Sequence, residues 1–279
     1  MKSLLPILAL VALLLAGGEA RATFVSFEEA EGYDSQDNKT VVGLPNPGDD
    51  EEWNGPWEKS SGNDNRAVSS TDVAFHGVRS LRLGQSQQIE IARDVDRSIN
   101  GGNPFHRIDV YAYVTQQAID NQVQATFFVS TASNKFDESA AFRTQFSSTD
   151  NRMNWFVWDN GVYVDTGVAV VADTWTHLLV EMNMIDKTYV PQIDGTYVLP
   201  TTTLEFGPGS GGNSASSNIT TGIGFEHDNN NGYVYFDAVG LRPNIPEPPV
   251  YFSLAGLIGA GLIPIWLRRR KERAAVQDS

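Results

Sequence analysis

The middle of this chain alternates apolar and polar residues with a period of two, and this pattern limits its fold more than any other feature. The alternation is clean over residues 107–114 and 175–182, and residues 123–129 form an apolar and aromatic run. A period of two places successive side chains on opposite faces of a strand. Asn160-Gly161 and Asp194-Gly195 separate pairs of such segments, and these dipeptides readily adopt the positive φ angles of hairpin turns. The pattern predicts an all-β fold, an antiparallel β-sandwich or jelly roll.

The composition excludes several classes of protein. There is no cysteine, so disulfides, thiol nucleophiles and cysteine-zinc sites are excluded. The formal net charge of −14 repels nucleic acid and attracts divalent cations. We therefore expect no nucleic-acid partner, and a domain that is stabilised by its own apolar core.

The first residues have the features of an export signal. Lys2 gives a positive start, residues 4–16 are apolar but short for a membrane span, and Ala20-Arg21-Ala22 fits a cleavage site for small residues. We expect residues 1–22 to be a signal peptide and residue 23 to begin the mature protein.

The end of the chain has three parts in a fixed order. Residues 244–249 form a proline-rich stalk, residues 250–267 are apolar without a charge, and residues 268–279 begin with a basic cluster. Eighteen residues in a helix span about 27 Å, enough for a hydrocarbon core. The positive residues after the span favour a cytoplasmic tail, which leaves residues 23–243 outside the cytoplasm.

The motif residues of this tail resemble a known sorting signal. They are Pro246, Glu247 and Pro248 before the apolar run, and Arg268, Arg269 and Arg270 after it. This order resembles the PEP-CTERM tail of Gram-negative bacteria, which implies a membrane peptidase of the exosortase type as a partner. It also implies cleavage near the Pro-Glu-Pro motif and release to the cell surface or matrix. Two features depart from the family: Pro249 stands where a small residue is more usual, and the chain continues to Ser279. A permanent membrane anchor is the alternative.

Several short segments of the large domain resemble a second family. They are Phe27-Glu28, the run from Gly77 to Leu83, the run from Asp173 to Leu178, Ile193-Asp194-Gly195 and the run from Phe236 to Val239. Their order resembles a concanavalin A-like, LamG-type lectin/glucanase domain over about residues 23–243. The resemblance implies a jelly roll of a kind that often binds sugars or calcium and includes some hydrolases.

Aromatic residues are the candidate sugar ligands. Trp53 and Trp57 lie in a polar region, residues 34–65, that we expect to be a loop, and Trp155, Trp158 and Tyr163 lie across one predicted hairpin. A flat ring stacks on the apolar face of a sugar. Trp155 and Trp158 are three apart, so on a strand they point to opposite faces, one into the core and one outward. The alternative is that the strand aromatics all serve packing, since aromatic residues suit strands.

Acidic residues near both ends of the domain are the candidate calcium ligands. Calcium binds six to eight oxygens from carboxylates and carbonyls. Since the first and last strands of a sandwich are often neighbours, Glu28 and Glu31 are expected to approach Asp237. The alternative is that these side chains serve only turns.

These features predict a non-catalytic exported domain that binds or lies within extracellular polysaccharide. Two alternatives stay open: a polysaccharide-degrading glycoside hydrolase, and a purely structural matrix protein. The E-x-D-x-x-E pattern of glucanases with this fold is absent, because Glu90 and Asp94 are four apart with Arg93 between them. A concave face lined with paired carboxylates 5 to 10 Å apart would favour the hydrolase.

Overall fold

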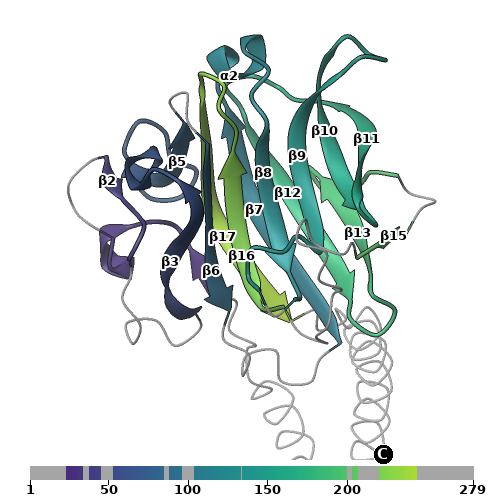
Figure 1. Cartoon of the computed structure of the whole chain (residues 1–279), viewed down its shortest axis with the longest axis horizontal. Coiled ribbons are helices and arrows are strands. Elements are labelled where there is room, and N and C mark those ends of the chain that lie inside the picture. The colour runs from purple at the N-terminus through teal and green to yellow at the C-terminus, as the bar shows by residue number, and fades with distance from the viewer. Residues whose placement is uncertain are drawn as a thin grey trace, which may run out of the picture. The chain divides into compact units, whose positions relative to one another are not determined.

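The strands of the protein form two antiparallel sheets whose inner faces share one core (Figure 1). The computed structural model describes residues 23–33, 38–44, 53–84, 88–95, 104–132, 134–199, 203–206 and 220–243. Two layers of sheet around one core make a β-sandwich, as the period-two pattern predicts.

The larger sheet has ten strands. Eight of them lie in the order β14-β13-β12-β7-β17-β5-β4-β2, while β1 pairs with β17 and β15 pairs with β13. Their bounds are β1 (Thr23–Val25), β2 (Lys39–Thr40), β4 (Ala67–Ser70), β5 (Ser80–Gly84), β7 (Phe105–Val114), β12 (Trp175–Asn183), β13 (Thr188–Ile193), β14 (Thr196–Tyr197), β15 (Leu204–Glu205) and β17 (Tyr233–Pro243). The pairing of Thr23 with Leu241 makes the first and last of these strands neighbours, as expected.

The smaller sheet has seven strands in the order β11-β10-β9-β8-β16-β6-β3. Their bounds are β3 (Trp53–Gly62), β6 (Ile89–Val95), β8 (Ala125–Ser130), β9 (Ala140–Ser147), β10 (Arg152–Asp159), β11 (Val162–Ala169) and β16 (Gly222–His227). Helical structure in the described residues is limited to η1 (Glu29–Glu31), η2 (Asp64–Arg66) and α2 (Gln116–Asp120).

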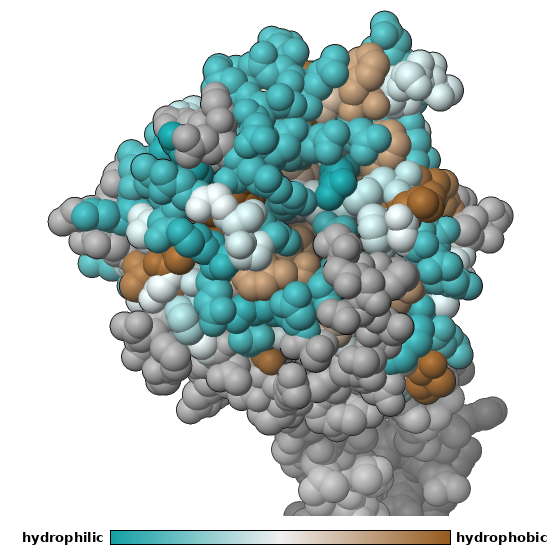
Figure 2. All heavy atoms as spheres, in the orientation of Figure 1, coloured by the Kyte–Doolittle hydropathy of each residue, from teal (hydrophilic) through white to brown (hydrophobic). Residues whose placement is uncertain are grey.

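Aromatic side chains fill the space between the sheets. Phe225 of β16 contacts Phe236 of β17 with ring centroids 4.6 Å apart, and Trp57 of β3 contacts Phe225 at 5.7 Å. Trp57 is fully buried and donates its indole N–H to the Tyr33 hydroxyl over 2.7 Å. Burial of such rings is the main stabilising contribution available to a chain without disulfides. Figure 2 shows that the face turned to the viewer is largely hydrophilic, with small separate hydrophobic areas.

Both predicted hairpins are confirmed. Asn160 and Gly161 join β10 to β11 with φ angles of 42° and 96°, and Asp194 and Gly195 join β13 to β14 with φ angles of 50° and 74°. Two consecutive positive φ angles match the twist of antiparallel strands, which explains the choice of residues at both turns.

The expectation of a loop over residues 34–65 is wrong in part, because ten of these residues form β3. Gly55 and Pro56 argue against a strand in the sequence, since both residue types are rare inside strands. The strand lies at the edge of the seven-stranded sheet, and its pairing with β6 shifts register between Asn54 and Glu58 and between Lys59 and Ser61. An edge strand with irregular pairing tolerates residues that a central strand does not.

The predicted signal peptide, stalk, membrane span and basic tail lie outside the described residues. Within the part of the chain that the structure describes, no helix has the length and apolar character needed to cross a bilayer. The described residues all belong to one unit of the chain.

Candidate functional site

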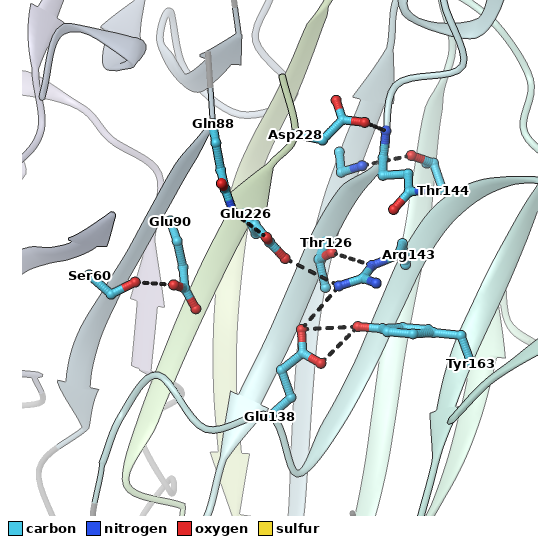
Figure 3. Close-up of polar contacts among 12 residues, drawn as sticks. Ser60, Gln88, Glu90, Thr126, Glu138, Arg143, Thr144, Tyr163, Glu226 and Asp228 are labelled. Atoms are coloured by element: carbon cyan, nitrogen blue, oxygen red, sulfur yellow. Dashed lines mark hydrogen bonds and ion pairs between the residues drawn. The ribbon is translucent and has the colours of Figure 1, made fainter. Parts of the chain in front are cut away.

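The outer face of the seven-stranded sheet carries a row of polar side chains, which we call the polar face (Figure 3). It consists of Ser60, Glu90, Glu226, Thr126 and Arg143 on five neighbouring strands, together with Glu138 and Tyr163. The register sets this row, because Glu90 lies opposite Glu226, Glu226 opposite Thr126, and Thr126 opposite Arg143. The residues beside them in sequence, such as Ile91, Phe225 and Phe127, point into the core.

Arg143 is the centre of the hydrogen-bond network on this face. Its Nε donates to the Thr126 hydroxyl at 2.9 Å, and its Nη2 lies 3.2 Å from Glu226 and 3.5 Å from Glu138. Its guanidinium also lies 3.8 Å from the centre of the Tyr163 ring. Arg143 therefore holds two carboxylates and one aromatic ring in fixed positions.

Glu138 is the most deeply buried carboxyl of the polar face, with 6% of its surface exposed. The Tyr163 hydroxyl lies 3.0 Å from both of its oxygens. Burial raises the pKa of Glu138 to about 7, although Arg143 and the Tyr163 hydroxyl oppose this, and Glu226 and Glu90 add to it. A carboxyl with this pKa exists in both protonation states near neutral pH.

Glu90 and Glu226 lie opposite each other on β6 and β16, which places their Cβ atoms about 5 Å apart. Ser60 donates a hydrogen bond to Glu90, and the Gln88 amide lies 3.2 Å from Glu226. Burial raises the pKa of Glu90, and the charges of Glu226 and Asp137 add to this effect. Both side chains are half-buried, so they remain within reach of a ligand.

Segment 134–139 brings Glu138 to the polar face. Lys135 fastens this segment to the far edge of the sheet, because its Nζ lies 2.9 Å from both Glu58 of β3 and Asp94 of β6. Lys135 is 8% exposed, and its two partners keep a buried ammonium charged by raising its pKa against the effect of burial. The position of Glu138 thus depends on two ion pairs that hold its segment against β3 and β6.

The candidate sugar-binding aromatics occupy different places. Trp57 and Trp155 lie in the main core, so neither presents a ring to solvent, and the side chain of Trp53 lies outside the described residues. Trp158 lies on the other face from Trp155, in a small cluster with Phe128, Ala141 and Tyr163, which confirms that the two tryptophans point in opposite directions. Trp158 is 8% exposed, and its indole N–H has no hydrogen-bond partner among the described residues.

The candidate calcium ligands hold one turn of backbone. Glu28 accepts hydrogen bonds from the amides of Val78 and Arg79 at 2.7 and 2.8 Å, and Asp237 accepts from those of Phe75 and His76 at 2.8 and 2.9 Å. Burial raises the pKa of Asp237 to about 7 despite these bonds, and the charge of Glu28 adds to this.

Glu31 binds a different part of the backbone from Glu28 and Asp237. Its carboxylate accepts from the amide and hydroxyl of Ser26, both at 2.8 Å. Nowhere in the described residues do three or more acidic or histidine side chains gather as a cation would require. The contacts of these carboxylates fit backbone amides, and a calcium site here stays a prediction.

The sequence did not point to three residues of the polar face, namely Glu138, Arg143 and Glu226. A signal is present for two of them: Arg143 is the one Asp, Glu, Lys or Arg residue of Ala140–Ser147, and Glu226 is the one such residue of Gly222–His227. Glu138 lies outside any strand, so no periodicity marks it. The sorting residues Pro246, Glu247, Pro248 and Arg268 to Arg270 lie outside the described residues.

Comparisons with known proteins do not assign a family. No family model matches the sequence, and no curated protein matches it. Three solved structures are similar in fold to most of this chain. A carbohydrate esterase from the Shiga toxin-encoding bacteriophage phi24B has 15% identity and a TM-score of 0.47, over 67% of this chain and 89% of that chain. The globular domain of T. cruzi calreticulin has 13% identity and a TM-score of 0.46, over 75% and 94%. Domain 4 of AbnA, an extracellular arabinanase from Geobacillus stearothermophilus in complex with arabinotriose, has 14% identity and a TM-score of 0.45, over 80% and 92%.

A sialidase also overlaps the fold, with 10% identity and a TM-score of 0.44, but only 17% of that chain is covered. At these identities and scores the overlaps carry no conclusion about function.

The raised pKa of Glu138 predicts that folding stability falls as the pH rises. A carboxyl whose folded pKa is about 7 contributes fully below its ordinary value of 4.5, and this contribution is lost as the pH rises through 7. We expect the native protein to lose up to about 3 kcal/mol of unfolding free energy from this group over that range, and Glu138→Gln to lose less. Urea unfolding at a series of pH values from 4.5 to 8 measures both. Glu29→Gln, at an exposed site, controls for the loss of one surface carboxylate, and equal slopes in native protein and Glu138→Gln would contradict the assignment.

The calcium prediction is tested by thermal unfolding of the full-length chain in calcium and in chelator. A bound ion at 100 times its dissociation constant adds about 2.7 kcal/mol to the unfolding free energy, which raises the Tm. Asp237→Asn should abolish this rise, whereas Asp186→Asn, at an exposed turn, should keep it. An equal Tm of the native protein in calcium and in chelator would contradict the prediction.

Proposed function

We propose that this domain binds extracellular polysaccharide through the polar face without cleaving it. The observation that carries the proposal is the row of hydrogen-bonding side chains across β3, β6, β16, β8 and β9. Sugar hydroxyls both donate and accept hydrogen bonds, and this row combines carboxylates with hydroxyl and guanidinium groups. Glu90, Glu226 and Arg143 are half-buried, so they are fixed in place yet accessible.

The negative charge of the domain favours neutral or amine-bearing polysaccharides over anionic ones.

Glycoside hydrolysis is a second candidate for the same face, and the raised pKa of Glu138 favours it. A carboxyl with a pKa of about 7 is suited to act as a general acid, and Glu90 and Glu226 supply the further carboxylates that such a reaction needs. We prefer binding because Glu138 is almost completely buried and both of its oxygens lie against the Tyr163 hydroxyl. In that position its proton faces the protein rather than a substrate.

We also propose that the domain is exported and sorted by its tail. The signal-like residues 1–22 and the order of the proline motif, apolar span and arginines support this. An exosortase-type peptidase is the expected partner, and the domain would be held at a membrane before its release to the cell surface or matrix.

Binding at the polar face predicts that Glu226→Gln weakens retention on polysaccharide at least tenfold. The substitution keeps the size of the side chain but removes the charge that pairs with Arg143, and hydrogen bonds to charged groups contribute about 1.5 to 3 kcal/mol. Affinity electrophoresis of the full-length chain through cellulose derivatives, β-1,3-glucan, xylan and deacetylated chitin measures retention. Glu181→Gln, on the other sheet, is the matched control and should behave like the native protein.

A reducing-sugar assay on the same polysaccharides separates the two candidates. Absence of products with the native protein supports binding alone, whereas products that disappear in Glu138→Gln would establish hydrolysis instead. No retention of the native protein on any of the four polysaccharides would overturn the proposal.

Sorting by the tail predicts that the mature protein lacks both ends. Intact-mass spectrometry of the protein recovered from the cell surface should find residue 23 at the start and no residue beyond the Pro246-Glu247-Pro248 region. Replacement of Glu247 with Ala should leave the tail attached. A mature protein that retains residues 268–279 would indicate a permanent anchor.

A further inference from the structure

The outer face of the ten-stranded sheet carries seven rings in unbroken contact, which we call the aromatic belt. In order of contact the belt consists of Tyr233, Tyr235, Tyr113, Trp175, Phe75, Tyr111 and His177. The belt lies on the opposite side of the sandwich from the polar face, because the two outer faces of a sandwich point away from each other.

The register of three neighbouring strands builds most of the belt. Tyr113 of β7 lies opposite both Tyr235 of β17 and Trp175 of β12, and Tyr111 lies opposite His177. The residues between them, such as Ala112, point into the core, so all of these rings point outward. Ring centroids of Tyr113 lie 5.4 Å from Trp175 and 5.9 Å from Tyr235.

Phe75 completes the belt from outside the sheet. It lies between β4 and β5 and stacks on Tyr111 with centroids 3.5 Å apart and planes 12° apart. The turn that carries it is held by Asp237 through the amides of Phe75 and His76, and by Glu28 through that of Val78. Phe75 is nevertheless 45% exposed, so this turn does not bury the ring but displays it.

The general preference of aromatic residues for strands accounts for single exposed rings but not for this arrangement. Phe75 belongs to no strand, and four other members, Tyr111, Tyr113, Trp175 and Tyr233, are only half-buried. The partly exposed rings are joined through the buried Tyr235 into one apolar surface, and an apolar surface rimmed by polar residues is typical of an interaction site.

Carboxylates hold the rings in place. The hydroxyl of Tyr235 donates to Asp72 at 3.2 Å, that of Tyr113 lies 3.5 Å from Asp173, and His177 Nε2 lies 3.1 Å from Asp109. Rings fixed in this way lose little conformational entropy when a ligand binds. The same carboxylates provide hydrogen-bond acceptors between and beside the rings.

We propose that the aromatic belt is a second glycan-binding surface, for neutral polysaccharides that stack their apolar sugar faces on its rings. Anionic glycans and nucleic acids are disfavoured, because the belt is bordered by Asp72, Asp109 and Asp173 and the chain has a net charge of −14. A protein partner is disfavoured because the centres of protein interfaces are depleted in charged residues, whereas the carboxylates of Asp72, Asp109 and Asp173 lie against these rings.

This proposal does not depend on the polar face, since it uses the other sheet. With both surfaces occupied, one domain would hold two polysaccharide chains on opposite sides.

The test compares Phe75→Ala and Trp175→Ala with the native full-length chain in affinity electrophoresis through hydroxyethyl cellulose, β-1,3-glucan, xylan and starch. Each substitution removes one ring, and we expect at least a tenfold loss of retention on the polysaccharide that the belt binds. Trp175→Tyr, which keeps a ring, should restore most of it. Tyr197→Ala is the matched control, because Tyr197 is an exposed tyrosine with its hydroxyl 3.2 Å from Glu181 but contacts no ring of the belt. Circular dichroism and the Tm show whether each variant is folded.

Phe75→Ala is expected to fold even if Trp175→Ala does not, because the Phe75 ring is 45% exposed and its removal leaves no closed cavity. Glu226→Gln loses retention on the polysaccharide that the polar face binds, so the belt variants are compared on a polysaccharide that retains Glu226→Gln like the native protein. Belt variants that are retained like the native protein would overturn the proposal, as would a native protein retained by none of the four polysaccharides. Self-association of the native chain that Phe75→Ala abolishes, without any retention, would instead assign the belt to protein contact.

Discussion

Burial of aromatic side chains between the two sheets is the interaction on which the rest of this structure depends. The chain has no cysteine, so no covalent link joins the sheets. Phe225 and Phe236 meet across the interface, and Trp57 fills the space beside Phe225 with its indole N–H satisfied by Tyr33. Most apolar residues of both sheets are used in this way, while one outer face carries the polar face and the other carries the aromatic belt.

The register of the strands connects this core to both proposed binding surfaces. On β16, Phe225 points inward and Glu226 points outward, and on β7, Ala112 points inward while Tyr111 and Tyr113 point outward. A shift of one residue in pairing would exchange the two faces of a strand. The apolar positions that fix the register for stability therefore also fix the lateral order of the polar face and of the aromatic belt.

Segments outside the strands complete both surfaces, and charged groups far away in the sequence hold them. Segment 134–139 supplies Glu138 and is fastened by Lys135 to Glu58 and Asp94. The turn between β4 and β5 supplies Phe75 and is held by Asp237, 162 residues away. In both cases the charged group has a structural partner, so its charge by itself does not indicate a ligand.

The sequence by itself determined the local features of this protein. Period-two alternation predicted the strands, Asn160-Gly161 and Asp194-Gly195 predicted both hairpins, and the spacing of Trp155 and Trp158 predicted that they face opposite ways. These features depend on residues close together in the chain, where backbone geometry alone decides the outcome.

Only the tertiary structure decided which side chains meet. Trp57 is in the core because the irregular strand β3 pairs with β6, a contact that Gly55 and Pro56 hide in the sequence. Arg143 meets Glu226 across 83 residues of chain, and Phe75 meets Tyr111 from a turn that no periodicity marks. Such contacts depend on sheet order and strand register, which are set by burial of the whole core rather than by any local pattern.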